Sequence, residues 1–144
     1  MAELYLIAYI DGCRVAINSG RIESIVQIPE IISVPRVDPS IAGLFALRSR
    51  VLTLIDSQYF VTGNRQQLAK GCLAVVVEIS GHHYGLAVDK VEDVVSISDE
   101  AIQKSISPSA KWKPVISEIA QVGDHLVMIL DPAKMVDCDQ LLAA

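Results

Sequence analysis

The chain has 144 residues, of which 51% are apolar and only 5% are aromatic. This length suits one domain, or two very small domains that share a core. A core built mainly from Ile, Val, Leu and Ala favours tightly packed β-structure over an aromatic ligand pocket. The net charge of −5 offers no basic surface for a phosphate backbone, so nucleic acid is not an expected partner.

The apolar stretches of the sequence are short. None approaches the roughly 18 uninterrupted apolar residues that a membrane span requires, and the first residues, MAELYLIAYIDG, contain no basic region or small-residue cleavage site. We therefore expect a cytoplasmic protein without direct membrane insertion. The three cysteines, Cys13, Cys72 and Cys138, are odd in number and widely separated. This pattern favours buried reduced thiols over a disulfide framework.

Two parts of the chain resemble each other at an offset of roughly 70 residues. In both 6–28 and 75–97, two apolar runs flank a turn glycine, which is Gly12 in the first copy and Gly81 in the second. A second similarity further along links 50–56 with 125–131. A unit of this size used twice indicates a duplicated supersecondary module.

Each copy begins with a predicted β-hairpin, because an Asp-Gly or similar turn between two apolar runs is a strong hairpin signal. After each hairpin, aliphatic residues in 21–26 and in 90–95 recur at i, i+3 and i+4, which predicts one or two turns of helix. Asn18 or Ser19 in the first copy and Asp89 in the second can cap these turns. The predicted hairpin strands are Leu4–Ile10 with Cys13–Ile17, and Leu73–Ile79 with His83–Val88.

The rest of each copy is also predicted to be mainly β-structure. Residues 29–39 contain three prolines, which predict an extended loop or an edge strand. The other expected elements are two strand pairs, 41–47 with 51–55 and 115–122 with 126–130, a linker at 63–67, and a terminal helix at 133–142 that follows Pro132. About five short strands and a helical turn in each copy suit a small closed barrel without exposed edges.

Candidate catalytic groups are sparse, and the sequence contains no common phosphate-binding or zinc-hydrolase motif. Cys13 and His83 are interpreted as strand residues rather than a nucleophile and its base. His82 and His83 would point to opposite faces of a strand, and no Cys or carboxylate lies at ligand spacing in the sequence, so no metal is expected. Asp56 and Asp131, at equivalent strand ends, are interpreted as turn formers. We expect neither an enzyme nor a cofactor.

Arg48 interrupts an otherwise apolar run. One interpretation is a semi-buried charge, which would be costly without a partner. The other is a residue at the rim that extends its guanidinium to water. The sequence does not decide between them.

Taken together, these segments resemble the CheW-like domain of bacterial chemotaxis coupling proteins, over nearly the whole chain from Tyr5 to Val136. The segments that carry the resemblance are a hairpin followed by 88–94 (VDKVEDV), the Val34-Pro35 loop, Gly43 with Leu47-Arg48, and 130–135 (LDPAKM). The resemblance implies a mainly β fold of two intertwined five-stranded SH3-like barrels, with short helical turns and a C-terminal helix.

The resemblance also implies how the chain is divided. It predicts a single domain over 1–144. Subdomain 1 would contain 12–66 together with the C-terminal helix at 132–144. Subdomain 2 would contain 67–131, with a possible contribution from 1–11.

The function implied by the resemblance is that of a non-enzymatic adaptor. One face would bind the regulatory domain of a CheA-type histidine kinase, and a groove between the barrels would receive the cytoplasmic tip of a chemoreceptor. In the second copy, Glu118 and Gly123 stand at the positions of Gly43 and Arg48, so only the first copy is expected to contact the receptor. The expected receptor-binding residues are Ile22, Gly43 and Arg48, and the expected kinase-binding residues are Val34, Ile41 and Leu44.

The chain departs from the family pattern at several positions, which leaves alternatives open. Ala46-Leu47-Arg48-Ser49 replaces the usual Asn-Leu-Arg-Gly, and Ser24, Thr53 and Glu118 replace a usual acid, proline and glycine. One alternative is a coupling protein of a pilus-type or other non-flagellar system, or a competitor that uncouples the kinase. A different class of function is a small-molecule enzyme or sensor that uses the groove, with Asp56, Asp89 and His83 as its titratable candidates.

Overall fold

The computed structural model describes residues 2–34, 39–64, 68, 70–103, 106, 108 and 112–136. Within these ranges the protein is mainly β-structure, with short α-helices (α) and 3-10 helices (η). In chain order the elements are β1 (Ala2–Ile10), β2 (Cys13–Asn18), η1 (Ser19–Arg21), β3 (Ile22–Gln27), β4 (Ile41–Leu47), β5 (Arg50–Ile55), α1 (Tyr59–Thr62), β6 (Leu73–Ile79), β7 (His82–Val88), β8 (Lys90–Ser98), η2 (Asp99–Ala101), β9 (Ile116–Val122), β10 (His125–Leu130) and α2 (Pro132–Met135).

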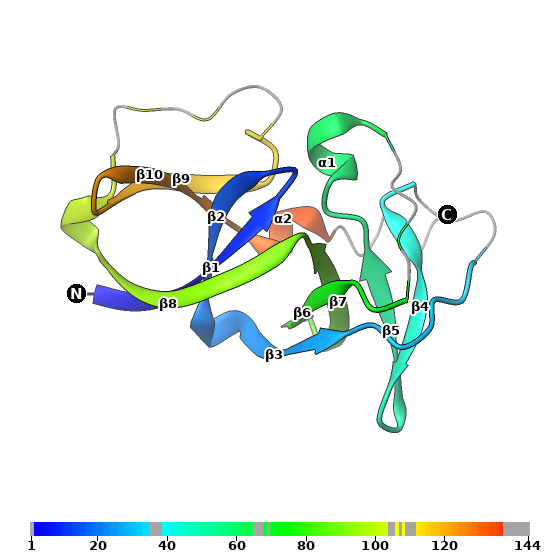
Figure 1. Ribbon diagram of the computed structural model, residues 1–144. Coiled ribbons are helices and arrows are strands. Elements are labelled where there is room, and N and C mark those ends of the chain that lie inside the picture. The colour runs from blue at the N-terminus through cyan, green and yellow to red at the C-terminus, as the bar shows by residue number, and fades with distance from the viewer. Residues whose placement is uncertain are drawn as a thin grey trace.

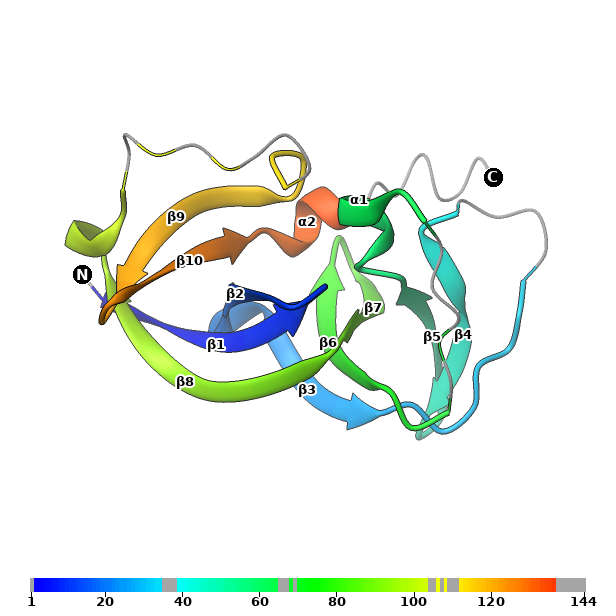
Figure 2. The same cartoon turned by 45° about the horizontal axis from the view of Figure 1, so that its top comes forward.

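The strands form two five-stranded sheets that lie side by side (Figure 1). The first has the order β8-β1-β2-β10-β9, and the second has the order β3-β6-β7-β5-β4. Each sheet therefore combines the hairpin of one copy with the last three strands of the other. In Figure 2, β3 leaves the first hairpin for the second sheet, and β8 leaves the second hairpin for the first sheet. The expected mainly β fold of two intertwined five-stranded SH3-like units is confirmed.

The sheets divide the chain differently from the expected subdomains. The second sheet is formed by one continuous stretch, 22–88, and the first sheet by the two flanking stretches, 2–18 and 90–130. The reason is strand pairing. The first hairpin does not pair with β3, which follows it, but with β8 on one side and with β10 on the other. A division at 66/67 therefore separates strands that pair with each other.

The segments expected to form helical turns after each hairpin are instead β3 and β8. Along β3, half-buried Ile22, Ser24 and Val26 alternate with exposed residues, which is the period of two expected for a strand. Of the two segments 21–26 and 90–95, only Arg21 belongs to a helix, the short η1. The predicted cap of this helix is present, because Asn18 Oδ1 accepts a hydrogen bond from the Gly20 amide at 2.8 Å. Asp89 caps no helix. Its carboxylate accepts from the Gly12 amide at 3.0 Å and from Gln58 Nε2 at 2.9 Å.

Turn chemistry explains the two hairpins that the sequence predicted. Asp11 and Gly12 join β1 to β2, and Ser80 and Gly81 join β6 to β7. All four residues have positive φ, as in the two-residue turn that matches the twist of paired strands. The later strand pairs, β4 with β5 and β9 with β10, are also confirmed.

The short helices were predicted less well. No helix was predicted at 59–62, where α1 lies. The expected terminal helix at 133–142 corresponds to α2, which begins at Pro132 and ends at Met135, and residues 137–142 lie outside the described residues. Asp131 caps α2, because its Oδ1 accepts a hydrogen bond from the Ala133 amide at 3.0 Å. Its predicted role as a turn former is therefore confirmed.

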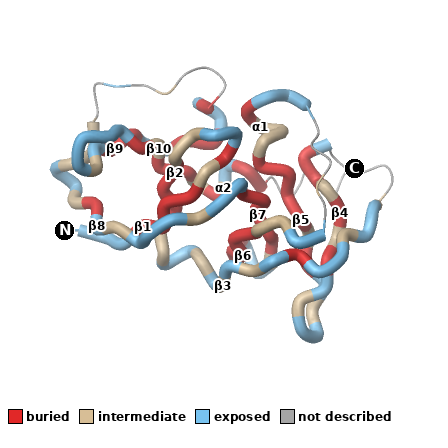
Figure 3. The backbone as a smooth tube through the Cα atoms, viewed as in Figure 1, coloured by how far each residue is buried: buried red, intermediate tan, exposed pale blue. Residues whose placement is uncertain are grey.

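The buried side chains fall into three apolar clusters, and the largest joins the two sheets. In β1, Leu6 points into this shared cluster, whereas Ile7 points into the interior of the first sheet. In β6, Val75 belongs to the shared cluster and Val76 to the interior of the second sheet. Runs of consecutive buried residues occur in β1 and β6, and also in their hairpin partners β2 and β7 (Figure 3). These central strands are therefore buried on both faces. The two sheets thus share one core.

Candidate functional site

The isolated candidates for catalysis do not come together among the described residues. Cys13 is on β2 of the first sheet and His83 is on β7 of the second, where its imidazole contacts Glu23 and Glu78. Asp56 is 1% exposed and follows β5. Its amide donates to the Ser40 carbonyl at 2.7 Å, in a turn that leads into α1. Cys13, His83 and Asp56 thus form no pair of a nucleophile and its base.

Arg48 lies in the tight turn between β4 and β5, where it has a φ of 60° and is exposed. The structure therefore supports the second interpretation of this residue, a cation at the rim that reaches water. Its neighbour Val51 is the most exposed large apolar residue of the described chain, at 67%. Arg48 is available to a partner without any change in the fold.

Ile22 begins β3 and is half-buried against the shared core. It also lines an open hollow of about 490 Å³ together with Gly20, Arg21, Glu23 and Glu78. The Arg50 guanidinium contacts the Glu23 carboxylate at 2.5 Å, so the β4–β5 hairpin is tied to the start of β3. The ion pair therefore connects the residue after Ile22 with a residue that lies two positions after Arg48 in the chain.

Gly43 is buried, and its lack of a side chain has a packing reason. A Cβ at this position would lie 2.5 Å from the Ile32 carbonyl oxygen and 2.8 Å from Ile31 Cγ2. The close approach lets Ile32 and Leu44 exchange two backbone hydrogen bonds of 2.8 Å. Gly43 thus allows the segment before β4 to pack against the edge of the second sheet.

The three kinase candidates differ in accessibility. Ile41 is only 5% exposed and belongs to the shared core, so its side chain cannot meet a partner while the fold is intact. Val34 and Leu44 are half-buried. Leu44 is bridged to Ile32, an aliphatic residue that is 55% exposed and that the sequence did not single out. Ile32 therefore exposes more apolar surface at this edge than Leu44 or Val34.

A cluster of three charged or titratable side chains was missed. His83 Nε2 lies 2.8 Å from Glu23 Oε2 and 3.2 Å from Glu78 Oε2. The guanidinium of Arg50 holds the pKa of Glu23 below its ordinary value, and the nearby imidazole lowers it further. Part of this cluster could be found in the sequence, because a two-residue turn at 80–81 places Glu78 opposite His83. Glu23 could not, since β3 reaches β6 only through the exchange of strands between sheets.

Comparison with known proteins agrees with this architecture. The family model described as the CheW-like domain matches residues 4–140. The chain belongs to the CheW-like domain family. The predicted resemblance is thereby confirmed. The family is one of coupling and scaffold proteins.

Two relatives of this CheW-like chain match over most of its length. The chemotaxis protein CheW of Bacillus subtilis (strain 168) is 23% identical over 136 residues, which cover 94% of this chain and 87% of that protein. The crystal structure of the scaffolding protein TtCheW from Thermoanaerobacter tengcongensis has a TM-score of 0.82 and 20% identity, and the match covers 97% of this chain and 91% of that one. This structural match supports the fold. Among the described residues, no helix is long and apolar enough to cross a membrane.

Proposed function

We propose that this CheW-like chain is a non-enzymatic adaptor that joins the cytoplasmic tip of chemoreceptors to the regulatory domain of a CheA-type histidine kinase. The family match over 4–140 carries this proposal. The arrangement of the described residues is consistent with it, because the interior is filled by apolar side chains and the accessible features lie at sheet edges and hairpin turns.

The receptor would bind beside the start of β3. A receptor tip that is a helical hairpin would present an apolar helix face to a groove, a common mode of peptide recognition. Ile22 supplies an aliphatic wall of the open hollow, and Arg48 supplies an exposed cation at the nearby hairpin turn. Gly43 acts indirectly in this proposal, by allowing the Ile32 segment to pack on β4.

The kinase would bind the β4 edge of the second sheet. Leu44, Val34 and the more exposed Ile32 form its apolar part. Ile41 supports this edge from the core. An apolar contact surrounded by polar residues is the usual composition of such interfaces.

The two contacts can be tested separately with purified partners. We expect Arg48→Glu to weaken receptor binding at least tenfold and to leave kinase binding unchanged, because the exposed cation is reversed and the fold is kept. Lys113→Glu makes the same charge change at an exposed position of a different loop and serves as the control. Leu44→Ser should weaken kinase binding instead, with circular dichroism to confirm folding.

The measurements are binding by surface plasmon resonance and receptor-dependent kinase activation in a reconstituted complex. Failure of the unaltered protein to bind either a CheA-type regulatory domain or a receptor tip would refute the proposal. Binding to the kinase without activation would indicate a competitor. Capture of partners from a pilus-type system alone would place the same two contacts in a non-flagellar array.

A further inference from the structure

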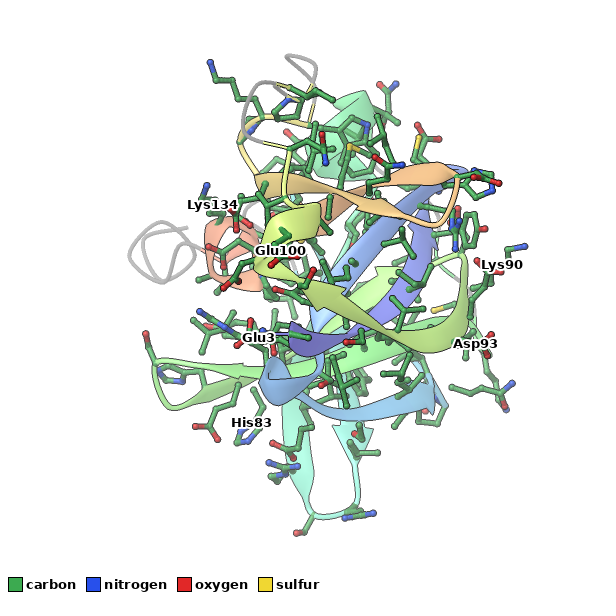
Figure 4. The ribbon with its side chains drawn as sticks, turned by 90° about the vertical axis from the view of Figure 1, so that its left-hand side faces the viewer. Glu3, His83, Lys90, Asp93, Glu100 and Lys134 are labelled. Carbon is green, nitrogen blue, oxygen red and sulfur yellow. The ribbon has the colours of Figure 1, made fainter. Side chains whose placement is uncertain are left out.

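Three strands of the second sheet bring together two carboxylates and an imidazole. Glu23 comes from β3, Glu78 from β6 and His83 from β7. One potential ligand atom from each residue lies within 4.8 Å of the others. Figure 4 shows His83 at the outer surface of the molecule, beside the β4–β5 hairpin.

Local strand geometry explains how these side chains meet. Glu78 and His83 are direct cross-strand partners in the β6–β7 hairpin. Between β3 and β6 the register shifts after Ile22, so that Ser24 pairs with the next residue of β6 and Glu23 is left as the extra residue of a β-bulge. Bulges redirect side chains and are frequent beside functional sites. Here the bulge brings Glu23 to the Glu78–His83 pair.

A single imidazole nitrogen faces both carboxylates of this cluster. Both carboxylates approach the same imidazole atom, Nε2, at 2.8 and 3.2 Å. That nitrogen carries at most one proton, so one N–H group would have to serve two acceptors. A divalent cation in place of the proton would bind the nitrogen and both oxygens at once.

We propose that Glu23, Glu78 and His83 bind one divalent transition-metal ion of the Zn²⁺ class. Zinc takes imidazole nitrogen and carboxylate oxygen at about 2.0–2.2 Å, and sites with three protein ligands leave a fourth position for water or another ligand. The present nitrogen–oxygen distances are compatible with such a site after movements of roughly a few tenths of an ångström. The site goes beyond the adaptor function and does not depend on it.

Arg50 and the adjacent hollow support this assignment. Arg50 contacts Glu23 Oε1, whereas Oε2 faces His83, so the arginine orients the carboxylate and leaves one oxygen for the ion. Outer partners of this kind commonly orient ligating carboxylates. The two carboxylates carry one negative charge more than Arg50 neutralises, which favours a cation. Glu23 and Glu78 also line the open hollow of about 490 Å³, which gives the ion access from water and room for a fourth ligand.

The test is zinc binding to the full chain after treatment with a chelator. Isothermal titration with ZnCl2 should give one site, and cobalt should give the visible absorption of a tetrahedral ion. His83→Ala and Glu78→Gln should each weaken zinc binding at least tenfold. His82→Ala is the matched control, because it removes the exposed neighbouring imidazole and should leave the affinity unchanged.

Circular dichroism and urea unfolding would establish that the variants fold. If the folded unaltered protein binds no zinc or cobalt at 100 μM (roughly −5.5 kcal/mol), the proposal is wrong. It is equally wrong if His83→Ala binds zinc as tightly as the unaltered protein, since the ion would then be held elsewhere, for example by the thiols of Cys13 or Cys72.

Discussion

The substitution Gly43→Ala tests whether this glycine is required by packing. The added Cβ would lie 2.5 Å from the Ile32 carbonyl oxygen, closer than such atoms approach in proteins. The segment before β4 would have to move away from the edge, and the two backbone hydrogen bonds between Ile32 and Leu44 would be lost. At about 0.5–1.5 kcal/mol each, this loss amounts to about 1–3 kcal/mol.

Backbone strain adds to this cost. An alanine held at the φ of +153° found for Gly43 costs about 1–3 kcal/mol. We therefore expect Gly43→Ala to lower the free energy of unfolding by about 2–6 kcal/mol. Urea unfolding followed by circular dichroism would measure this change, and hydrogen exchange at the Ile32 and Leu44 amides would show whether the edge opens.

Gly63→Ala is the matched control for the strain alone. Gly63 also has a positive φ, of +75°, but nothing lies within 4 Å of its added Cβ. It should lose only the strain contribution of about 1–3 kcal/mol. Equal losses for the two variants, or unchanged hydrogen exchange at Ile32 in Gly43→Ala, would refute the packing explanation and leave a direct receptor contact as the reason for this glycine.

Three further predictions concern other parts of the fold. Asp89→Ala removes two hydrogen bonds, one from the first hairpin turn and one from Gln58 at the start of α1. It should lower the free energy of unfolding in urea by about 1–3 kcal/mol. Asp93→Ala, at an exposed position of β8, is the control, and an equal loss of stability in both variants would contradict the prediction. Gly85→Ala places a Cβ 2.7 Å from Phe45 Cε1 and should lower the free energy of unfolding by about 1–3 kcal/mol. Adding Phe45→Leu should restore part of this stability in the double variant. A double variant without any recovery would argue against this contact. Burial raises the pKa of the Cys72 thiol, so less thiolate is present at a given pH. The rate of its alkylation by iodoacetamide, followed by mass spectrometry, should therefore rise with pH around a midpoint above that of a free thiol. A midpoint at or below that of a free thiol would show that burial does not control the reactivity of Cys72.

Elements that depend on neighbouring residues could be predicted from this sequence, and elements that depend on distant residues could not. The hairpins were predicted because the turn residues lie between the strands that they join. β3 and β8 were mistaken for helical turns, since β3 passes between the sheets and its aliphatic residues Ile22, Ile25 and Val26 fit a helical spacing as well as a strand. Which strands pair between the copies has no local signal, and for that reason the sheets divide the chain at other positions than the expected subdomains.

The same distinction holds for the candidate site. The resemblance named Ile22 and Arg48, which the structure leaves accessible, and Ile41, which it buries. Along β4, buried Ile41, Gly43 and Phe45 alternate with half-buried Ala42 and Leu44, so the period of two could have assigned Ile41 to the interior. The contact between Glu23 and His83 depends on a β-bulge and on the exchange of strands between the sheets, so it cannot be predicted from any spacing in the sequence.

The division of the chain between the sheets also sets an order for folding during synthesis. The second sheet is complete once residue 88 has left the ribosome, whereas the first strand of the chain must wait for β8 and its hairpin partner for β10. Contacts between such distant segments form slowly, and the waiting β1–β2 hairpin exposes apolar surface in the meantime. Ile22 and Arg48, the side chains proposed to meet the receptor, therefore assemble early, in the sheet that is formed by one continuous stretch of the chain.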